Sequence, residues 1–192
     1  NDVQQNDVQQ NDVQQNDVQQ NDVPPKDWTT KTMEDEKTEF KSSIRINVDR
    51  YDHGEIDHLT LKDDTLVEEI VKTICGFGNA DGGELIIGKR DDGTIFGLEY
   101  DMKLFKKPNI DQLKNYLAST FRKRIKDMGF VSKLKIYWDT IDGKTICLVK
   151  VPSRGKKAIF TSDEKFYARI QTSTPNLSPE ETNDYITENF SN

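Results

Sequence analysis

Three carboxylates are the side chains in this sequence that could bind a metal ion and support catalysis. Glu34 and Glu39 are five residues apart, and Asp91 follows the apolar run that ends at Ile87-Gly88. Carboxylate oxygens that converge can hold Mg²⁺ or Mn²⁺, and such an ion can orient a phosphodiester and activate a water molecule. The spacing alone does not bring the three together, because the chain has 34 acidic residues and the default for each is a solvated surface charge.

Basic residues form the second group that could do chemistry. Arg154-Gly155-Lys156-Lys157 is a basic loop with a flexible glycine, so its backbone and side chains could grip phosphates; a solvated loop is the alternative. The basic run at 122–126 closes a predicted helix, where cations favour the helix dipole whatever the function. Tyr167 could stack on a base, although core packing of the Phe166-Tyr167 pair is the stronger expectation.

The remaining motifs point away from other chemistries. The only cysteines, Cys75 and Cys147, lie in apolar periodic segments, so we expect buried hydrophobic side chains rather than a disulfide or a metal pair. The stretch 83–90 is close to a phosphate-binding Walker loop. Arg90 stands where that loop needs Ser or Thr, and the interior is a β-branched strand instead of a glycine-rich turn. Nothing here indicates nucleotide hydrolysis.

Charge and repetition divide the chain. The net charge is −7, but residues 1–27 contain six aspartates and one lysine and so carry −5 of it. A near-neutral domain can still present a basic face. Asn-Asp-Val-Gln-Gln occurs four times from Asn1, and one valine in five residues cannot build a core. We expect a repetitive polar tail or linker over residues 1–27 and one folded domain over residues 28–192.

Targeting signals are not apparent in the sequence. No apolar run approaches the ~20 residues of a membrane span, and the N-terminus is polar throughout. Together with the reduced cysteines this favours an intracellular protein, cytoplasmic or in the nucleoid or nucleus, with no membrane partner.

Helical periodicity predicts three helices. Leu66, Ile70, Ile74 and Phe77 fall on one face of the first, which a Thr65/Glu68 capping box begins and Asn79 ends. The second covers about 110–126, with Leu113, Leu117 and Phe121 as its inner stripe. The third starts at Ser178-Pro179-Glu180-Glu181, which offers an N-cap, a proline at the first position and a reciprocal glutamate.

We also predict about six strands, and we expect the polar stretch 48–64 to be a loop. Asp92-Gly93 and Asp142-Gly143 are hairpin signals that join neighbouring strands. The strands are predicted over residues 39–46, 85–87, 94–98, 133–138, 144–151 and 165–170. The fold class is therefore a mixed α+β sandwich of roughly six strands and three helices.

The order of these elements resembles a known family. Asn79-Ala80-Asp81-Gly82-Gly83 leads into the strand that ends at Ile87-Gly88; Glu39-Phe40-Lys41 lies upstream, and Phe166-Tyr167-Ala168-Arg169 lies downstream. In this order they resemble the Schlafen-type domain, also called the divergent Alba-like (AlbA) domain. The resemblance spans about residues 33–190 and supports the α+β fold class.

The resemblance also gives the carboxylates a role. In Schlafen-type nucleases a glutamate, a second glutamate five residues on in a Glu-Phe-Lys motif, and an aspartate after the Ile-Gly strand form a three-carboxylate site. Glu34, Glu39 and Asp91 match these positions, with Asp92 as a one-residue alternative. The resemblance implies that they bind Mg²⁺ or Mn²⁺ and are catalytic. The cations expected to contact nucleic acid are Lys41, Lys89, Arg90, Arg154, Lys156, Lys157 and Arg169.

Two departures from the animal Schlafen proteins bear on function. Their zinc-binding Cys/His cluster is absent, since Cys75, Cys147, His53 and His58 lack ligand spacing. Their nuclease also closes a groove from two lobes, whereas this chain supplies one, so we expect a homodimer or a partner Schlafen-like lobe.

Together these features predict a nucleic-acid-binding domain, with RNA preferred over DNA as the partner. Metal-dependent endoribonuclease activity is the first expectation for its function. The alternative is a non-catalytic DNA- or RNA-binding module of a transcription regulator, and a protein-interaction domain is a third.

Overall fold

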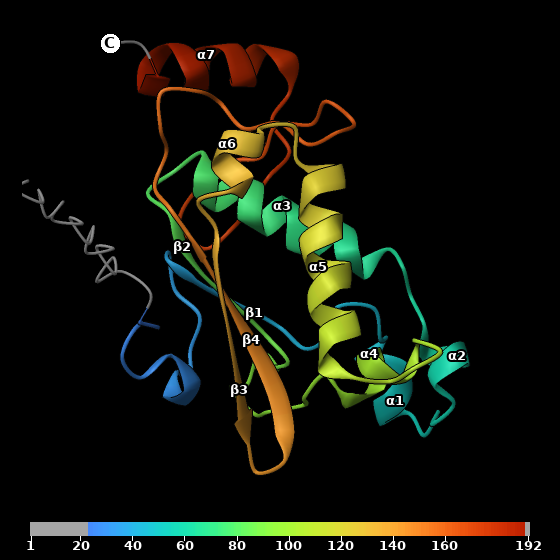
Figure 1. The fold of residues 1–192 in the computed structure, drawn as a ribbon. Helices are drawn as coiled ribbons and strands as arrows, with labels where there is room; N and C mark the ends of the chain where they lie inside the picture. The colour runs from blue at the N-terminus through green and yellow to red at the C-terminus, as the bar shows by residue number, and fades with distance from the viewer. Residues whose placement is uncertain (1–22, 191–192) are drawn as a thin grey trace, which may run out of the picture.

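The computed structural model describes residues 23–190, so the predicted repeat tail lies almost wholly outside the described residues. Helices and strands are interspersed along the chain (Figure 1). In chain order they are η1 (Trp28–Thr30), β1 (Thr38–Lys41), α1 (Val48–Asp52), α2 (His58–Leu61), α3 (Leu66–Gly78), β2 (Gly83–Ile87), α4 (Glu99–Lys103), α5 (Ile110–Arg124), α6 (Met128–Val131), β3 (Lys135–Ile141), β4 (Lys144–Val151) and α7 (Pro179–Phe190).

One four-stranded sheet organises the described residues, in the order β1-β2-β4-β3. β1 and β2 are parallel, with Glu39 opposite Leu85, and the other two pairings are antiparallel. Since β1, β2 and β3 begin where β4 ends, one end of the sheet gathers residues from all four strands. The opposite end carries the β3–β4 hairpin turn.

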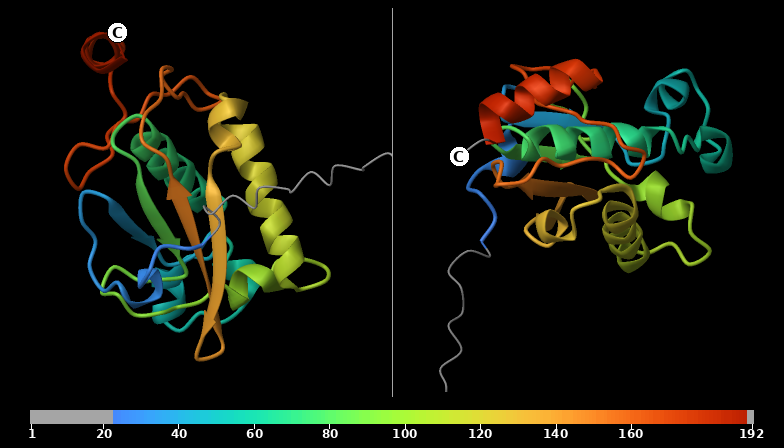
Figure 2. Two further views of the ribbon diagram at one scale, coloured as in Figure 1. Left: turned by 60° about the vertical axis from the view of Figure 1, so that its left-hand side comes forward. Right: turned by 90° about the horizontal axis from the view of Figure 1, so that it is seen from above.

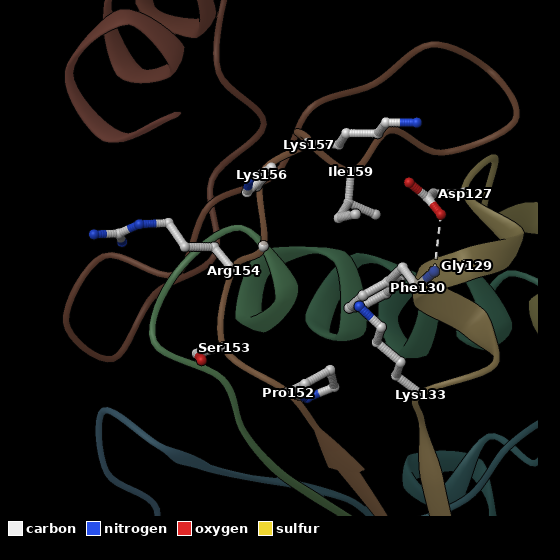
Figure 3. A pocket seen from close by; sticks show the side chains of 11 residues that line it. Asp127, Gly129, Phe130, Lys133, Pro152, Ser153, Arg154, Lys156, Lys157 and Ile159 are labelled. Carbon is white, nitrogen blue, oxygen red and sulfur yellow. Dashed lines mark hydrogen bonds between the residues drawn. The ribbon is translucent and has the colours of Figure 1, made fainter. Parts of the chain in front are cut away.

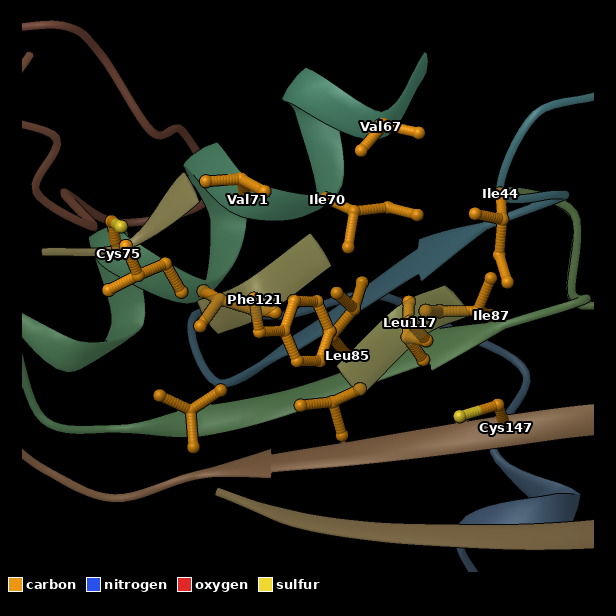
Figure 4. Packing of buried hydrophobic residues seen from close by; sticks show 14 of the residues in the cluster. Ile44, Val67, Ile70, Val71, Cys75, Leu85, Ile87, Leu117, Phe121 and Cys147 are labelled. Atoms are coloured by element: carbon orange, nitrogen blue, oxygen red, sulfur yellow. The ribbon is translucent and has the colours of Figure 1, made fainter. Parts of the chain in front are cut away.

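Helices α3 and α5 cover one face of this sheet, and the N-terminal segment with η1 lies on the other (Figures 1 and 2). The larger core is therefore between the helices and the sheet, where Ile70, Leu85, Phe121 and Cys147 meet (Figure 4). A smaller cluster on the other face packs Trp28 against the strands. The described helices include none that is both long and apolar enough to cross a bilayer.

The predicted helices are mostly confirmed. α5 buries Leu113, Leu117 and Phe121, and α7 begins with Ser178 and Glu181 bonded to each other's backbone amides. α3 ends at Asn79 as expected. The capping box predicted at its start is wrong, because the Thr65 hydroxyl donates to Asp63 at 2.6 Å and leaves the first turn uncapped.

The count of six strands and three helices is also wrong, and the reason is local. Residues 94–98 make only a single bridge, Lys89 to Ile95, because the amides of Phe96 and Gly97 both bond to the Gly88 carbonyl and turn the chain into α4. Residues 165–170 form isolated bridges between positive-φ residues at 164 and 171. The polar stretch 48–64 holds two short helices, α1 and α2, each capped by an Asn or Asp side chain.

Two cysteines and two glycines behave as packing residues. Cys75 and Cys147 are buried and unpaired, as predicted, and burial raises the pKa of the Cys75 thiol to about 12. Thr174 and the Phe130 ring occupy the space beside Gly76 and Gly78 on α3. An added Cβ would clash, because it would lie 2.3 Å from Thr174 at residue 76 and 2.4 Å from the Phe130 ring at residue 78. The C-terminal segment and α6 therefore pack directly on the helix backbone.

Candidate nucleic-acid interface

The turn between α3 and β2 supports the basic loop at 152–159. Gly82 has φ +72°, and a Cβ there would lie 2.7 Å from both the Ser153 amide nitrogen and the Val151 carbonyl oxygen. The Arg154 amide donates to the Ala80 carbonyl at 2.8 Å. This close backbone contact explains Gly82, since any side chain at residue 82 would push the loop away.

Asn79 fixes the far end of the same loop. Its buried side-chain amide donates to the carbonyls of Ile159 and Tyr167, both at 2.8 Å, and its oxygen accepts the Ile159 amide at 2.7 Å. The Asn79 carbonyl in turn accepts the Tyr185 hydroxyl of α7 at 2.9 Å. One residue at the end of α3 thus holds three separate segments in place, two through its side chain and one through its backbone carbonyl.

A hollow of about 570 Å³ lies between this loop and α6. Figure 3 shows the loop on one side of it and α6, with Lys133 just beyond, on the other. We call it the basic hollow; it is lined by Asp127, Gly129, Phe130, Lys133, Pro152, Ser153, Arg154, Gly155, Lys156, Lys157 and Ile159. Three of these residues were predicted from the sequence as phosphate contacts, and the structure brings them together.

The electrostatics of the basic hollow favour an anion. Its four cations face a single acid, Asp127, whose carboxylate already accepts the Phe130 amide at 2.8 Å and so caps α6. Arg154 has one loose ion pair, 3.6 Å from Asp81. Lys133 was missed by sequence reasoning because it lies at the start of a predicted strand, and only the fold places it beside the loop at 152–159.

Of the predicted carboxylates, Glu39 lies on the edge strand β1, Glu34 precedes this strand and Asp91 follows β2. Glu34 accepts the outward-pointing amide of Phe40 at 2.6 Å and so covers part of the sheet edge. Glu39 is held by two cations: Lys41 Nζ lies 2.6 Å from its Oε1 and Arg169 Nη1 lies 2.8 Å from its Oε2. Through these bonds both glutamates stabilise the fold.

The pKa of Glu34 nonetheless depends on the charges of the other two carboxylates. Its pKa is raised, chiefly by partial burial and further by the nearby charges of Glu39 and Asp91, against the lowering effect of the Phe40 amide and Lys41. Asp91 is exposed, and with Lys41 it lines a smaller hollow of about 290 Å³ beside α1 and α3. The charges of Glu39 and Asp91 therefore act on Glu34.

A divalent ion does not fit this arrangement as it stands. Carboxylate oxygens are the right donors, but both oxygens of Glu39 already face ammonium or guanidinium groups. Within residues 23–190, no three His, Cys, Asp or Glu side chains are grouped as a metal ion would need. The Mg²⁺ or Mn²⁺ site remains a prediction that rests on the resemblance.

A family model described as Schlafen, AlbA_2 matches residues 34–178, about three quarters of the chain. The chain belongs to the Schlafen AlbA_2 family. The match begins at Glu34, ends at Ser178 and contains every residue predicted for the site.

One solved structure shows a similar fold for this AlbA_2 domain. The crystal structure of the DIP2311 protein from Corynebacterium diphtheriae matches with a TM-score of 0.54 at 16% identity, covering 82% of this chain and 28% of that chain. The present chain thus spans little more than a quarter of that protein. The N-terminal domain of a putative ATP-dependent DNA helicase RecG-related protein from Nitrosomonas europaea matches with a TM-score of 0.41 at 21% identity, covering 76% and 85%. No curated protein matches the chain.

Two of the cations predicted for the rim lie inside the AlbA_2 domain instead. Lys89 is 1% exposed, donates to the carbonyls of Thr29 and Lys31, and has a pKa lowered by burial. Arg169 donates to the Asp35 carbonyl at 2.9 Å as well as to Glu39, so it ties the C-terminal segment to β1. Their sequence positions beside the carboxylates indicated proximity but not burial.

The third rim cation, Arg90, is on the surface but engaged. Its guanidinium binds the Asp52 carboxylate through two nitrogens and lies 5.1 Å from the centre of the Phe96 ring. Tyr167 is half-buried and packs against the larger core, as core packing of this residue predicted. The cations that face solvent together are therefore those of the basic hollow.

Proposed function

We propose that this Schlafen AlbA_2 domain binds nucleic acid, RNA in the first instance, through phosphate contacts in the basic hollow. The observation that carries the proposal is that Lys133, Arg154, Lys156 and Lys157 all line one hollow whose only acid is already hydrogen-bonded. Cations arranged in this way neutralise phosphates and release counterions. Membership of an AlbA_2 family supports the same class of ligand.

Salt dependence tests this proposal. Each phosphate contact to a single strand contributes about 0.7 to the slope of log affinity against log salt. Changing Arg154, Lys156 and Lys157 together to Ala should lower that slope by about 2 and weaken binding of an RNA of about 12 nucleotides at least tenfold. Fluorescence anisotropy over about 50–200 mM salt measures both quantities.

The matched control removes the same charges from the other end of the molecule. Arg50, Lys106 and Lys107 are exposed residues on and after the short helices α1 and α4, far from α6 in Figure 1. Changing these three to Ala should leave affinity and slope close to those of the parent protein. Equal losses in the two triple variants would contradict a specific role for the basic hollow.

A second candidate function is RNA cleavage by Glu34, Glu39 and Asp91 with Mg²⁺ or Mn²⁺. The pKa of Glu34, which is raised chiefly by burial and further by the charges of Glu39 and Asp91, favours it, whereas the cations on Glu39 do not. Titration of Mn²⁺ with thermal unfolding tests it, because an ion that binds only the folded state raises the melting temperature. Glu39→Gln should abolish that rise together with any cleavage. Binding without cleavage, as in a non-catalytic module, is the outcome that the present arrangement favours.

A further inference from the structure

A second hollow adjoins the basic hollow at the end of the sheet. It has a volume of about 410 Å³ and shares Pro152 and Ser153 with its neighbour. We call it the lysine hollow; it is lined by Lys31, Lys37, Asp81, Gly83, Glu84, Lys150, Val151, Pro152 and Ser153. None of its lysines is among the residues predicted from the sequence.

The acids of the lysine hollow are already compensated. Glu84 lies 2.5 Å from Lys31, which also donates to the Thr38 hydroxyl, and Asp81 faces Arg154 of the basic hollow. Lys37 and Lys150 are exposed, and their ammonium groups have no acidic partner in the described part of the chain. These two cations are therefore free to meet a further anion.

The two hollows lie on different sides of the sheet end. Phe130 and Ile159 of the basic hollow belong to the core on the helix-covered face. Glu84 and Lys150 are opposite each other on β2 and β4, on the face that Ile86 and Leu148 share with Trp28. A ligand that occupies both hollows must bend around Pro152 and Ser153.

The dimensions suit the backbone of one strand. Four strands at a spacing of about 4.8 Å put the two edges of the sheet about 14 Å apart. At an axial rise of about 3.4 Å per nucleotide in a stacked strand, that distance corresponds to about four nucleotides. A flexible single strand can follow the bend, whereas a duplex with a persistence length of about 50 nm cannot.

We propose that a single nucleic-acid strand continues from the basic hollow around Pro152 and Ser153 into the lysine hollow, where Lys37 and Lys150 contact its phosphates. This inference rests on the proposed function and adds the ligand class: an unpaired strand with more phosphates than the basic hollow alone can contact. Arg154 lies at the junction, paired with an acid of the lysine hollow while it lines the basic one.

Glutamine variants of the two lysines test this path. Lys37→Gln with Lys150→Gln should lower the salt slope for an oligouridylate of about 12 nucleotides by about 1.4 and its affinity on the order of tenfold. The matched control, Lys106→Gln with Lys107→Gln, removes the same charge elsewhere and should change neither. A slope within error of the control would overturn the proposal.

Protection from acetylation tests the path without any variant. The bound oligouridylate should slow acetylation of Lys37 and Lys150 as well as Lys156 and Lys157, whereas Lys106 should react at its unbound rate. A duplex of the same length should protect the basic hollow alone. Protection of the basic hollow without Lys37 and Lys150 would refute the inference and leave the proposed function standing; no binding at all would refute both.

Discussion

At the scale of single residues, Asn79 has the greatest influence on the proposed interface. It ends α3, and its side chain is fully buried. That side chain forms hydrogen bonds with backbone groups of Ile159 and Tyr167 that would otherwise have no partner. Buried amides and carbonyls are costly when left without a partner. The geometry of the basic hollow therefore depends on a residue that does not line it.

Asn79→Ala should lower the free energy of unfolding by about 3 kcal/mol, because it leaves one amide and two carbonyls without partners at roughly 1–3 kcal/mol each, partly recovered by relaxation. Urea unfolding measures this, and Asn115→Ala on the exposed face of α5 is the control, expected within about 0.5 kcal/mol of the parent protein. If the two variants prove equally stable, the bonds of Asn79 contribute nothing net.

Asp101 makes stability depend on pH. Its carboxylate is fully buried, accepts the Ser43 hydroxyl at 2.6 Å and the Arg45 amide at 2.7 Å, and its pKa is raised to about 6 by burial. In the unfolded chain the pKa of an aspartate is about 3.9, so between these values the folded state binds more protons. Stability from this group is present below the lower value and is lost as pH rises towards the upper one.

Asp101→Asn should remove this loss. Between about pH 4 and about pH 7, the parent protein should lose on the order of 3 kcal/mol of unfolding free energy relative to the variant, since each pKa unit corresponds to about 1.4 kcal/mol. Urea unfolding at several pH values measures the difference, with Asp139→Asn as an exposed control. Parallel pH profiles for the parent and Asp101→Asn would show that Asp101 does not titrate in this range.

The site residues show what one sequence can reveal. Arg154, Lys156 and Lys157 were predictable because they are adjacent, and adjacency along a loop survives folding. Lys89 was also predicted to contact nucleic acid. Its neighbours in the sequence do not indicate that the Thr29 and Lys31 carbonyls accept hydrogen bonds from it in the fold. Lys37 and Lys150 were not predicted, because only strand pairing places them in one hollow.

At the scale of elements, long periodic helices were predictable and short irregular segments were not. α3 and α5 have apolar stripes that fix both their existence and their inner faces. The Asp142-Gly143 turn joins β3 to β4 as expected, with both residues at positive φ. Residues 94–98 and 165–170 have strand-like composition, but tertiary contacts at Gly88 and around Arg169 decide their course.

α7 should open more readily than α3. It buries no residue completely, whereas α3 buries nine, and its start depends on the reciprocal bonds of Ser178 and Glu181. Ser178→Ala should cost about 1 kcal/mol of local stability, as is typical for loss of an N-cap. Amide hydrogen exchange checks this: rates should rise about fivefold in α7 and stay constant in α3, and an equal rise in both helices would mean that α7 does not open separately.

At the scale of the whole molecule, the two edges of the sheet differ. Glu34 accepts the outward amide of Phe40, so it blocks part of the β1 edge, while β3 forms the other edge. A homodimer, expected from the need for a second lobe, should therefore pair β3 with β3 and double the mass from 22.1 kDa. Light scattering with and without RNA decides this, and a single-chain mass in both conditions would leave a different lobe as the partner.

The hydrogen bonds of Asn79 couple two distant parts of the molecule. Its side chain holds the end of the basic loop and its carbonyl holds Tyr185, so loop and C-terminal helix share one anchor. Free-energy coupling between two sites is reciprocal: if an occupied loop steadies α7, then an ordered α7 must raise affinity at the loop by the same factor. Whatever docks on α7 or pulls it away would then act as an effector of strand binding without touching a phosphate contact.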